Sequence, residues 1–346
     1  MDGDSLKENL LIGMGNPLLD ISAIVDKSFL DKYELQENDA ILADEKHKNL
    51  FKELTENHRV SYTAGGSVQN TLRVAQWLLK KPNVTTFFGC VGKDDYSKIL
   101  YDNAVKAGVN VRYQYNTSIP TGTCAVLITG HNRSLVTTLD SANCFTIEHL
   151  HDSINRKLMD TARFYYVSGF FLTVNPEAQM EMAKVASEKN RPFMMNLSAP
   201  FICQFFSQAL QNAMPYIDIL FGNESEAEAF STSLNLGTKN LEEIALKLSD
   251  LPKENLNRKR IIIITQGVDP IIVASDGKIT KFPVQTIEQE KIVDTNGAGD
   301  AFAGGFLSQY IIGKNLDVCI ECGIWAATEI IQRSGCTFEG DPTFSN

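Results

Sequence analysis

The sequence has no excess of basic residues, no long apolar run and no even set of cysteines. Its 346 residues carry 32 lysines and arginines against 42 aspartates and glutamates, so the net charge is −10. Nucleic acids and anionic membranes both favour basic patches, and no segment supplies one. No apolar run approaches the roughly 20 residues that span a bilayer, and we see no basic-then-apolar leader. The seven cysteines suit reduced thiols. We therefore expect a cytoplasmic monomer whose partners are small molecules, with no nucleic acid and no membrane.

The common nucleotide-binding motifs are also missing. There is no GxxxxGK[ST] loop, and the triplets His-Arg-Asp and Asp-Phe-Gly are absent. Gly13-Met14-Gly15 lacks the third glycine of a dinucleotide fingerprint, and Gly297-Ala298-Gly299 lies too near the C-terminus to leave a full dinucleotide-binding half after it. These absences argue against a P-loop protein, a protein kinase and a hydride-transfer enzyme.

What the chain does contain, from about residue 65 onward, is an alternation of apolar β-rich runs with amphipathic helices. The predicted strands are Thr85–Val91, Arg163–Ser168, Phe193–Leu197, Ile217–Phe221 and Arg260–Thr265. The predicted helices are Thr71–Leu79, Tyr96–Ala107, Glu177–Lys189, Leu241–Ser249, Ala301–Ile312 and Leu316–Gln332. This order predicts an α/β fold, a doubly wound and mostly parallel sheet with helices on both faces.

Two stretches interrupt the alternation. In the second, Cys124–Thr129 and Ser134–Leu139 flank the turn Gly130-His131-Asn132-Arg133 and predict a hairpin. We assign residues 17–64 and 118–141 to a small α/β lid domain. Residues 1–16, 65–117 and 142–346 then form the large nucleotide-binding domain.

Asp300 is the most informative residue, because it stands on the first turn of the helix predicted from Ala301. Lys291–Val293 is interpreted as the end of a strand before it, so Gly297, Ala298 and Gly299 should direct free backbone N–H groups from the helix N-terminus. Such a nest holds a transferring phosphoryl group, and a carboxylate beside it suits proton removal from an attacking hydroxyl. The alternative is that Asp300 is an ordinary capping acid in a tight turn.

Polar and glycine residues gather where the predicted strands end. They occur in Asn16–Asp20 after the first strand, in Gly65–Asn70 before a helix, in Asn223–Glu226 and in Thr265–Gly267. In an open α/β sheet, ligands bind beyond the carboxyl ends of the strands, so these segments predict one shared site.

Gly65-Gly66 together with the string from Asp294 to Asp300 resembles the ribokinase-type carbohydrate kinase family. Further strings are similar to those of the family members that phosphorylate adenosine, and the resemblance runs from about residue 10 to the C-terminus. They are Gly15–Ser22, Pro120–Cys124, Asn132–Leu135, Gly169–Thr173, Asn196–Phe201 and Phe221–Glu224. The resemblance implies a ribokinase-like fold and transfer of the ATP γ-phosphate to the 5′-hydroxyl of adenosine, giving AMP and ADP in purine salvage.

The resemblance also implies roles for individual residues. Asp300 would be the base, with Gly297, Ala298, Gly299 and Arg133 completing the catalytic group. Asp20 would anchor the ribose diol, which a carboxylate can hold at two points. The remaining adenosine-binding residues would be Asn16, Leu18, Gly65, Gly66, Ser67, Asn70, Leu135, Phe171, Phe201 and Asn296, and Phe170 is interpreted as core.

On the ATP side, the resemblance implies Mg²⁺ as cofactor, held through water near Glu226. The residues expected to bind ATP and Mg²⁺ are Asn223, Glu226, Thr265, Gly267 and Ala327. Two alternatives stay open: a sibling kinase for another nucleoside or a free sugar, and a catalytically silent nucleotide-binding regulator. The pair Phe171 and Phe201 argues against a bare sugar, which has no large flat face to stack, and the complete catalytic group argues against a silent regulator.

Overall fold

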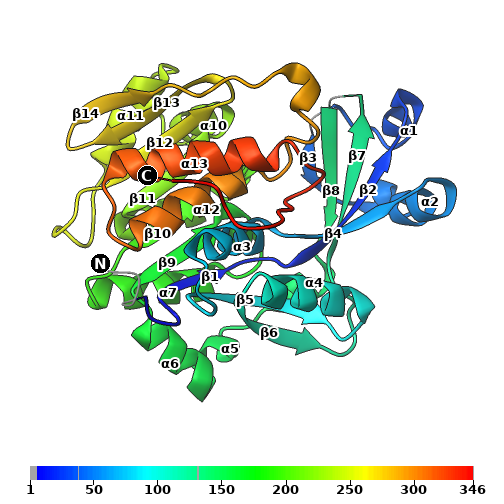
Figure 1. The fold of residues 1–346 in the computed structure, drawn as a ribbon, viewed down its shortest axis with the longest axis horizontal. Helices are drawn as coiled ribbons and strands as arrows, with labels where there is room; N and C mark the ends of the chain where they lie inside the picture. The colour runs from blue at the N-terminus through cyan, green and yellow to red at the C-terminus, as the bar shows by residue number, and fades with distance from the viewer. Residues whose placement is uncertain (1–5, 38, 131, 346) are drawn as a thin grey trace.

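The computed structural model describes residues 6–37, 39–130 and 132–345, which form two β-sheets (Figure 1). The larger sheet has nine strands in the order β14-β13-β12-β11-β10-β9-β1-β5-β6. Neighbouring strands are parallel from β6 through β12, and β13 and β14 are antiparallel at the edge. The strands are β1 Leu11–Met14, β5 Thr85–Gly92, β6 Asn110–Asn116, β9 Phe164–Ser168, β10 Phe193–Asn196, β11 Ile219–Asn223, β12 Ile261–Gln266, β13 Asp269–Ser275 and β14 Lys278–Phe282.

Helices cover both faces of this sheet, because alternate strand residues point to opposite sides. In β9, Tyr165 and Val167 enter one core cluster and Tyr166 enters the other. The cluster with Tyr166 receives α3 Ser67–Leu79, α4 Asp95–Lys106, α12 Ala298–Tyr310 and α13 Leu316–Ile330. The opposite cluster receives α5 Glu148–His151, α6 Ser153–Thr161, α7 Pro176–Glu188, α8 Pro200–Phe205, α9 Ser207–Ala213, α10 Glu224–Ser233 and α11 Leu241–Ser249. Short 3-10 turns lie at Glu45–His47, Asp140–Cys144, Gly169–Thr173, Met214–Tyr216 and Gln289–Lys291.

The order of the strands reverses beside β1. From β1 the chain adds β5 and β6 on one side, then returns to add β9, β10, β11 and β12 on the other. Loops that leave β1 and β9 therefore diverge at the carboxyl edge of the sheet, and such a switch point opens a crevice for a ligand.

The five-stranded sheet stands over this edge (Figure 1). Its order is β3-β8-β7-β2-β4, with β2 Leu18–Ile24, β3 Ala40–Leu42, β4 Ser61–Gly65, β7 Thr123–Thr129 and β8 Asn132–Thr138. One face packs on α1 Lys27–Lys32 and α2 Leu50–Asn57, and Ile21, Ala125 and Val136 point to that side. Asp20, Cys124 and Leu135, one residue away along each strand, face the cavity described below.

The predicted fold class is confirmed, and so are the five predicted strands and six predicted helices, with shifts of a few residues at their ends. The predicted hairpin is β7–β8, whose strands pair antiparallel; His131 of its turn, like residues 1–5 of the predicted large domain, lies outside the described residues. The two sheets draw on the two predicted sets of segments, although the domain boundaries stay a prediction.

The strand predicted at Lys291–Val293 is wrong. A 3-10 turn occupies Gln289–Lys291, and the N–H groups of Val293 and Asp294 both donate to the carbonyl of Ile331 at the end of α13. These N–H groups thus bond to the end of a helix. A β-strand forms only where its backbone can pair with a neighbouring strand, which this segment does not do. None of the helices in the described ranges is long and apolar enough to cross a membrane.

Candidate active site

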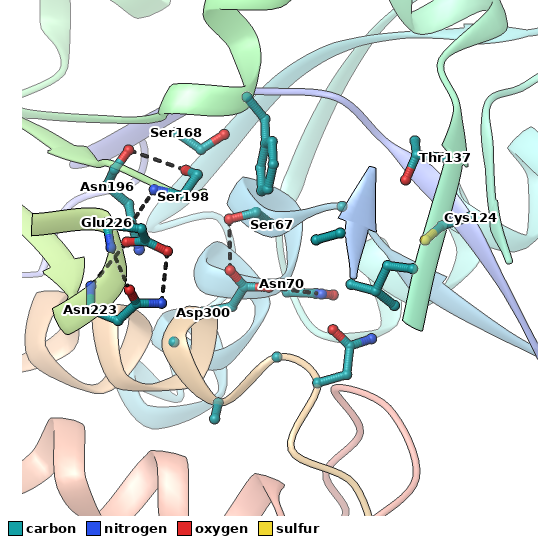
Figure 2. Close-up of a pocket in the computed structure, with 18 of the residues that line it drawn as sticks. Ser67, Asn70, Cys124, Thr137, Ser168, Asn196, Ser198, Asn223, Glu226 and Asp300 are labelled. Atoms are coloured by element: carbon teal, nitrogen blue, oxygen red, sulfur yellow. Dashed lines mark hydrogen bonds between the residues drawn. The ribbon is translucent and has the colours of Figure 1, made fainter. Parts of the chain in front are cut away.

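A cavity of about 730 Å³ lies between the carboxyl edge of the nine-stranded sheet and the inner face of the five-stranded sheet. Figure 2 shows Asp300 with Ser67 and Asn70 at its centre, Glu226 and Asn223 to one side, and Cys124 and Thr137 on the small sheet opposite. The predicted site residues that line it are Asn16, Leu18, Asp20, Gly66, Ser67, Asn70, Leu135, Phe201, Asn223, Glu226, Thr265, Gly267, Asn296, Gly297, Ala298, Gly299 and Asp300.

Asp300 lies in the first turn of α12, which begins after Gly297. The Gly297 backbone has a φ of 80°, in the left-handed region that glycine adopts without strain. Its N-cap residue, Gly297, has no side chain to accept from the first turn. The Ala298 N–H, predicted to be free for an anion, donates instead to the Thr295 carbonyl at 3.2 Å, so the amides left to face the cavity are those that follow it, of Gly299 and Asp300. A helix N-terminus of this kind attracts anions.

The Asp300 carboxylate is held by two donors from α3. Its Oδ1 accepts from Ser67 Oγ at 2.6 Å and its Oδ2 from Asn70 Nδ2 at 3.2 Å (Figure 2). Burial raises its pKa to about 6, and the two hydrogen bonds oppose that rise. A carboxylate with this pKa is mostly ionised at neutral pH and basic enough to take a proton. Because its partners lie on another helix, Asp300 does not act as the capping acid of α12.

Asp20 lies on the inner face of β2 and is only 6% exposed. Its pKa is raised to about 8, first by burial and then by the charges of Asp300 and Asp294, while Arg73 acts in the opposite direction. Gly65 lies behind this carboxylate rather than in the cavity wall. A Cβ on Gly65 would stand 2.2 Å from Asp20 Oδ1, so any side chain there would displace the carboxylate.

The aromatic wall differs from the prediction in one residue. Phe171 was expected to face the ligand, but it is fully buried and packs on Phe145 with ring centroids 5.3 Å apart. Phe170, expected in the core, lines the cavity beside Phe201, at a centroid distance of 6.2 Å. These residues lie in the 3-10 turn Gly169–Thr173, where successive side chains point about 120° apart, so only one of two neighbours can face the cavity.

Asn223 and Glu226 form a capping box at the start of α10. Asn223 Oδ1 accepts from Glu226 N at 2.8 Å, and the Glu226 carboxylate accepts from the backbone N and Nδ2 of Asn223, each at 2.9 Å. Burial raises the pKa of Glu226 to about 7. Among the described residues, no group of three or more His, Cys, Asp or Glu side chains is placed to hold a metal ion. A metal here would need oxygen ligands from water or substrate.

Besides Gly65 and Phe171, two further predicted residues do not line the cavity, Arg133 and Ala327. Arg133 was expected to reach the transferring phosphate, but its Nη2 donates to the Val293 carbonyl at 2.5 Å and its Nε lies 3.3 Å from Asp294 Oδ1. The Arg133 guanidinium therefore forms an ion pair with the buried Asp294 carboxylate. Ala327 lies in α13, where it packs against the core cluster that contains Phe306.

The sequence analysis missed several residues that line the cavity, among them Phe170, Ser168, Asn196, Ser198, Cys124 and Thr137. Ser168 and Asn196 are the last residues of β9 and β10, so the rule of polar strand ends could have found them. Cys124 and Thr137 could be found only from the register of the small sheet, since they face each other across β7 and β8.

This chain belongs to the pfkB family of carbohydrate kinases, whose model matches residues 27–343. Within that family it is similar to adenosine kinases. Adenosine kinase 1 of Arabidopsis thaliana is 48% identical over 338 residues, which cover 98% of each chain. The crystal structure of Anopheles gambiae adenosine kinase in complex with P1,P4-di(adenosine-5) tetraphosphate superposes with a TM-score of 0.96 at 56% identity, over 98% of this chain and all of the other. Adenosine kinase from Schistosoma mansoni, in complex with adenosine and AMP, has a TM-score of 0.92 at 35% identity over 98% and 100% of the two chains.

Proposed function

We propose that this protein transfers the γ-phosphoryl group of ATP to the 5′-hydroxyl of adenosine, producing AMP and ADP. The observation that carries the proposal is the position of Asp300, a half-buried carboxylate in the first turn of α12, in the cavity between the two sheets. The adenosine kinases that match almost the whole chain support this substrate.

In the reaction, Asp300 removes the proton from the 5′-hydroxyl as its oxygen attacks the γ-phosphorus. Ser67 and Asn70 keep the carboxylate ionised and oriented. The N–H groups at the start of α12 stabilise the negative charge that develops on the transferring phosphoryl oxygens, because they are oriented before the substrate arrives. The proton ends on Asp300, and ADP leaves with the bridging oxygen.

The adenosine would sit between the two sheets. In its ionised form Asp20 would accept hydrogen bonds from both ribose hydroxyls, and its pKa of about 8 means that ribose binding has to favour that form. Asn16 lies beside it in the cavity wall: its Nδ2 donates to the Phe170 carbonyl at 3.3 Å, and its Oδ1 is buried with no partner among the described residues. The purine would lie against Leu135 and the Phe170 and Phe201 rings, where stacking contributes about 1 kcal/mol beyond burial.

The triphosphate would extend toward Asn223, Glu226, Thr265 and Gly267, on the other side of Asp300. Glu226 and Asn223 fit a Mg²⁺ ion held through water, because the Glu226 oxygens already accept from Asn223 and can take further hydrogen bonds from water more readily than they can enclose a bare ion. When bound with ATP, Mg²⁺ would neutralise charge on the phosphate oxygens.

The five-stranded sheet would act as the lid. Its inner face supplies the wall opposite Asp300, and Arg133 ties it to residues 293 and 294, just before the Gly297 turn. A lid fixed there excludes water that could otherwise accept the phosphate. We propose that the protein acts as a monomer. The reaction belongs to purine salvage and AMP formation, which we place in the cytoplasm, in keeping with seven cysteines that are all free.

A coupled ADP-release assay tests the proposal. The wild-type protein should turn over with adenosine, ATP and Mg²⁺, and more slowly with 2′-deoxyadenosine, which offers Asp20 only one hydroxyl. Inosine, guanosine and free ribose serve as the competing substrates. Equal or faster turnover with ribose would contradict an adenosine-specific site, and no ADP release above an Asp300→Asn control with any acceptor would contradict a kinase.

A further inference from the structure

A buried arginine lies behind the site and has no part in the mechanism above. Arg73 is on α3, one turn after Asn70, and is only 6% exposed. Its Nη1 shares its hydrogens among three oxygens: the carbonyl of Cys336 at 3.2 Å, Asn70 Oδ1 at 3.4 Å and the carbonyl of Ala64 at 3.5 Å. Burying such a cation is costly unless its contacts compensate, so its place calls for an explanation.

Three separate elements fix the guanidinium. Ala64 belongs to β4 of the small sheet, Asn70 to α3, and Cys336 to the C-terminal segment that crosses the front of the molecule (Figure 1). The Phe338 ring lies 5.3 Å from the Arg73 Cζ, in cation–π contact. The arginine therefore has little freedom to rotate, and its direction is set before any ligand binds.

The consequence falls on Asn70. A carboxamide has one accepting and one donating end, and only one orientation serves both of its neighbours. Arg73 can only donate, so it takes the Asn70 Oδ1, which leaves the Nδ2 to donate to Asp300 Oδ2 at 3.2 Å. If the amide turned over, its oxygen would face the Asp300 carboxylate and the two would repel each other.

We propose that Arg73 is a positioning residue that acts through Asn70: it holds the amide so that its NH₂ group faces the base. The inference rests on the proposed function, since the base is defined by that reaction. Arg73 touches neither Asp300 nor the cavity, and among the described residues its other acceptors are backbone carbonyls. Its effect on kcat should therefore pass through the hydrogen bond to Asn70, whereas the loss of its charge near Asp20, whose pKa Arg73 lowers, should appear in KM for adenosine.

The test compares kcat, KM and thermal melting for Arg73→Met and Arg73→Lys. Arg73→Met removes every donor and should lower kcat about tenfold, the scale on which supporting residues act, with little change in KM for ATP. Arg73→Lys keeps one cationic donor within a flexible chain and should restore most of kcat. Should Arg73→Met fail to give a cooperative melt, Arg73→Gln takes its place, because its shorter amide falls short of the Nη1 position.

Arg260 offers a matched control. It is also fully buried, but it donates to five backbone carbonyls at the opposite edge of the sheet, those of Met214, Ile217, Leu248, Leu251 and Pro252. Arg260→Met, compared at a temperature where it is folded, should lower the melting temperature and leave kcat unchanged, because it removes the same charge and donors as Arg73→Met. This contrast separates a loss of buried charge from a loss of orientation.

A double-mutant cycle with Asn70→Ala tests whether Arg73 affects kcat through Asn70. If Arg73 acts through Asn70, then Arg73→Met should change kcat by less than twofold once Asn70 is alanine. A full tenfold loss in that background, a folded Arg73→Met with wild-type kcat, or an equal loss in Arg73→Lys would each overturn the inference. Failure of the proposed function looks different, because the wild-type protein itself would then not phosphorylate adenosine.

Discussion

Carboxylates that are largely shielded from solvent occur at both edges of the nine-stranded sheet, and their partners differ: Asp218 is buried and Asp300 half-buried. Asp218, just before β11 at the amino edge, has Lys253 at 2.5 Å and Arg258 at 3.2 Å, and also accepts from Phe193 N. At the carboxyl edge, Asp300 accepts only from the neutral Ser67 and Asn70. Among the described residues, neither Asp300 nor Asp20 forms an ion pair.

The presence or absence of cationic partners distinguishes carboxylates that support the fold from those that can react with a ligand. A buried charge whose partners are all present has no capacity left for a ligand, and the fold depends on the pair in the sense that removing one partner leaves the other charge buried and uncompensated. A buried carboxylate without a cation has a raised pKa, as Asp300 and Asp20 do, and can accept a proton or a hydroxyl group. We therefore expect the carboxylate at the amino edge of this sheet to support the fold and those at the carboxyl edge, called the reactive edge below, to take part in binding and catalysis.

The largest effect should come from Asp300→Asn, which keeps the shape of the side chain and removes its basicity. We expect kcat to fall by roughly 10²–10⁴, with a modest change in adenosine binding. Steady-state and single-turnover kinetics measure this fall. A loss of less than about tenfold would mean that the unpaired carboxylate at the carboxyl edge is not the base.

Asp218→Ala should do the opposite. It leaves Lys253 and Arg258 without their buried partner, so the free energy of unfolding should drop by about 3–5 kcal/mol, as measured by denaturant titration. At a temperature where the variant is folded, kcat should match the wild type. A large loss of kcat in the folded variant would break the distinction between the two edges.

Asp20→Ala should act on binding. It would remove the carboxylate that accepts from both ribose hydroxyls and weaken adenosine binding by about 2–4 kcal/mol, leaving ATP binding nearly intact. Calorimetric titration with each ligand gives the two affinities separately. If both ligands weakened equally, Asp20 would be a structural residue despite its position at the reactive edge.

Much of this reactive edge could be predicted from the sequence, because parallel strands bring their carboxyl ends together. Asn16 follows β1, Asn223 and Thr265 lie at the carboxyl ends of the apolar strands β11 and β12, and Asp300 follows a glycine run before a helical pattern. These signals are local in sequence, and all four residues line the cavity as their positions at strand ends and at a helix start predict.

The rest depends on geometry that no local pattern records. Whether Phe170 or Phe171 faces the ligand is decided by the rotation of a 3-10 turn. Arg133 donates to Val293, which lies 160 residues further along the chain. The prediction of a strand at Lys291–Val293 was wrong because the N–H groups of Val293 and Asp294 bond to the end of α13. The role of Arg73 could not be predicted either, since two of its three acceptors, the carbonyls of Ala64 and Cys336, lie in other elements of the fold.

Arg133→Ala should have a smaller effect than the carboxylate variants. It removes the contacts from the lid to Val293 and Asp294, so we expect kcat to fall about tenfold with little change in adenosine affinity, because the fixed lid excludes water from the reaction. Arg133→Lys should recover only part of the loss, since the planar fork is gone. If Arg133→Ala had the kcat of the wild type, the contacts of Arg133 to Val293 and Asp294 would not contribute to the reaction.

The smallest expected effect is a shift in pH dependence. Asp300 must be ionised to take a proton, and its pKa is raised to about 6, so kcat measured at saturating adenosine, where Asp20 is already engaged, should fall as the pH drops through about 6. The Ser67 hydroxyl donates to the ionised carboxylate and lowers this pKa. Ser67→Ala should therefore move the acid limb of the profile to higher pH, by about one unit or less, because one hydrogen bond to a charged group contributes about 1.5–3 kcal/mol and water can replace part of it. An acid limb that stays in place, or moves to lower pH, would show that the titrating group is not the carboxylate that Ser67 holds.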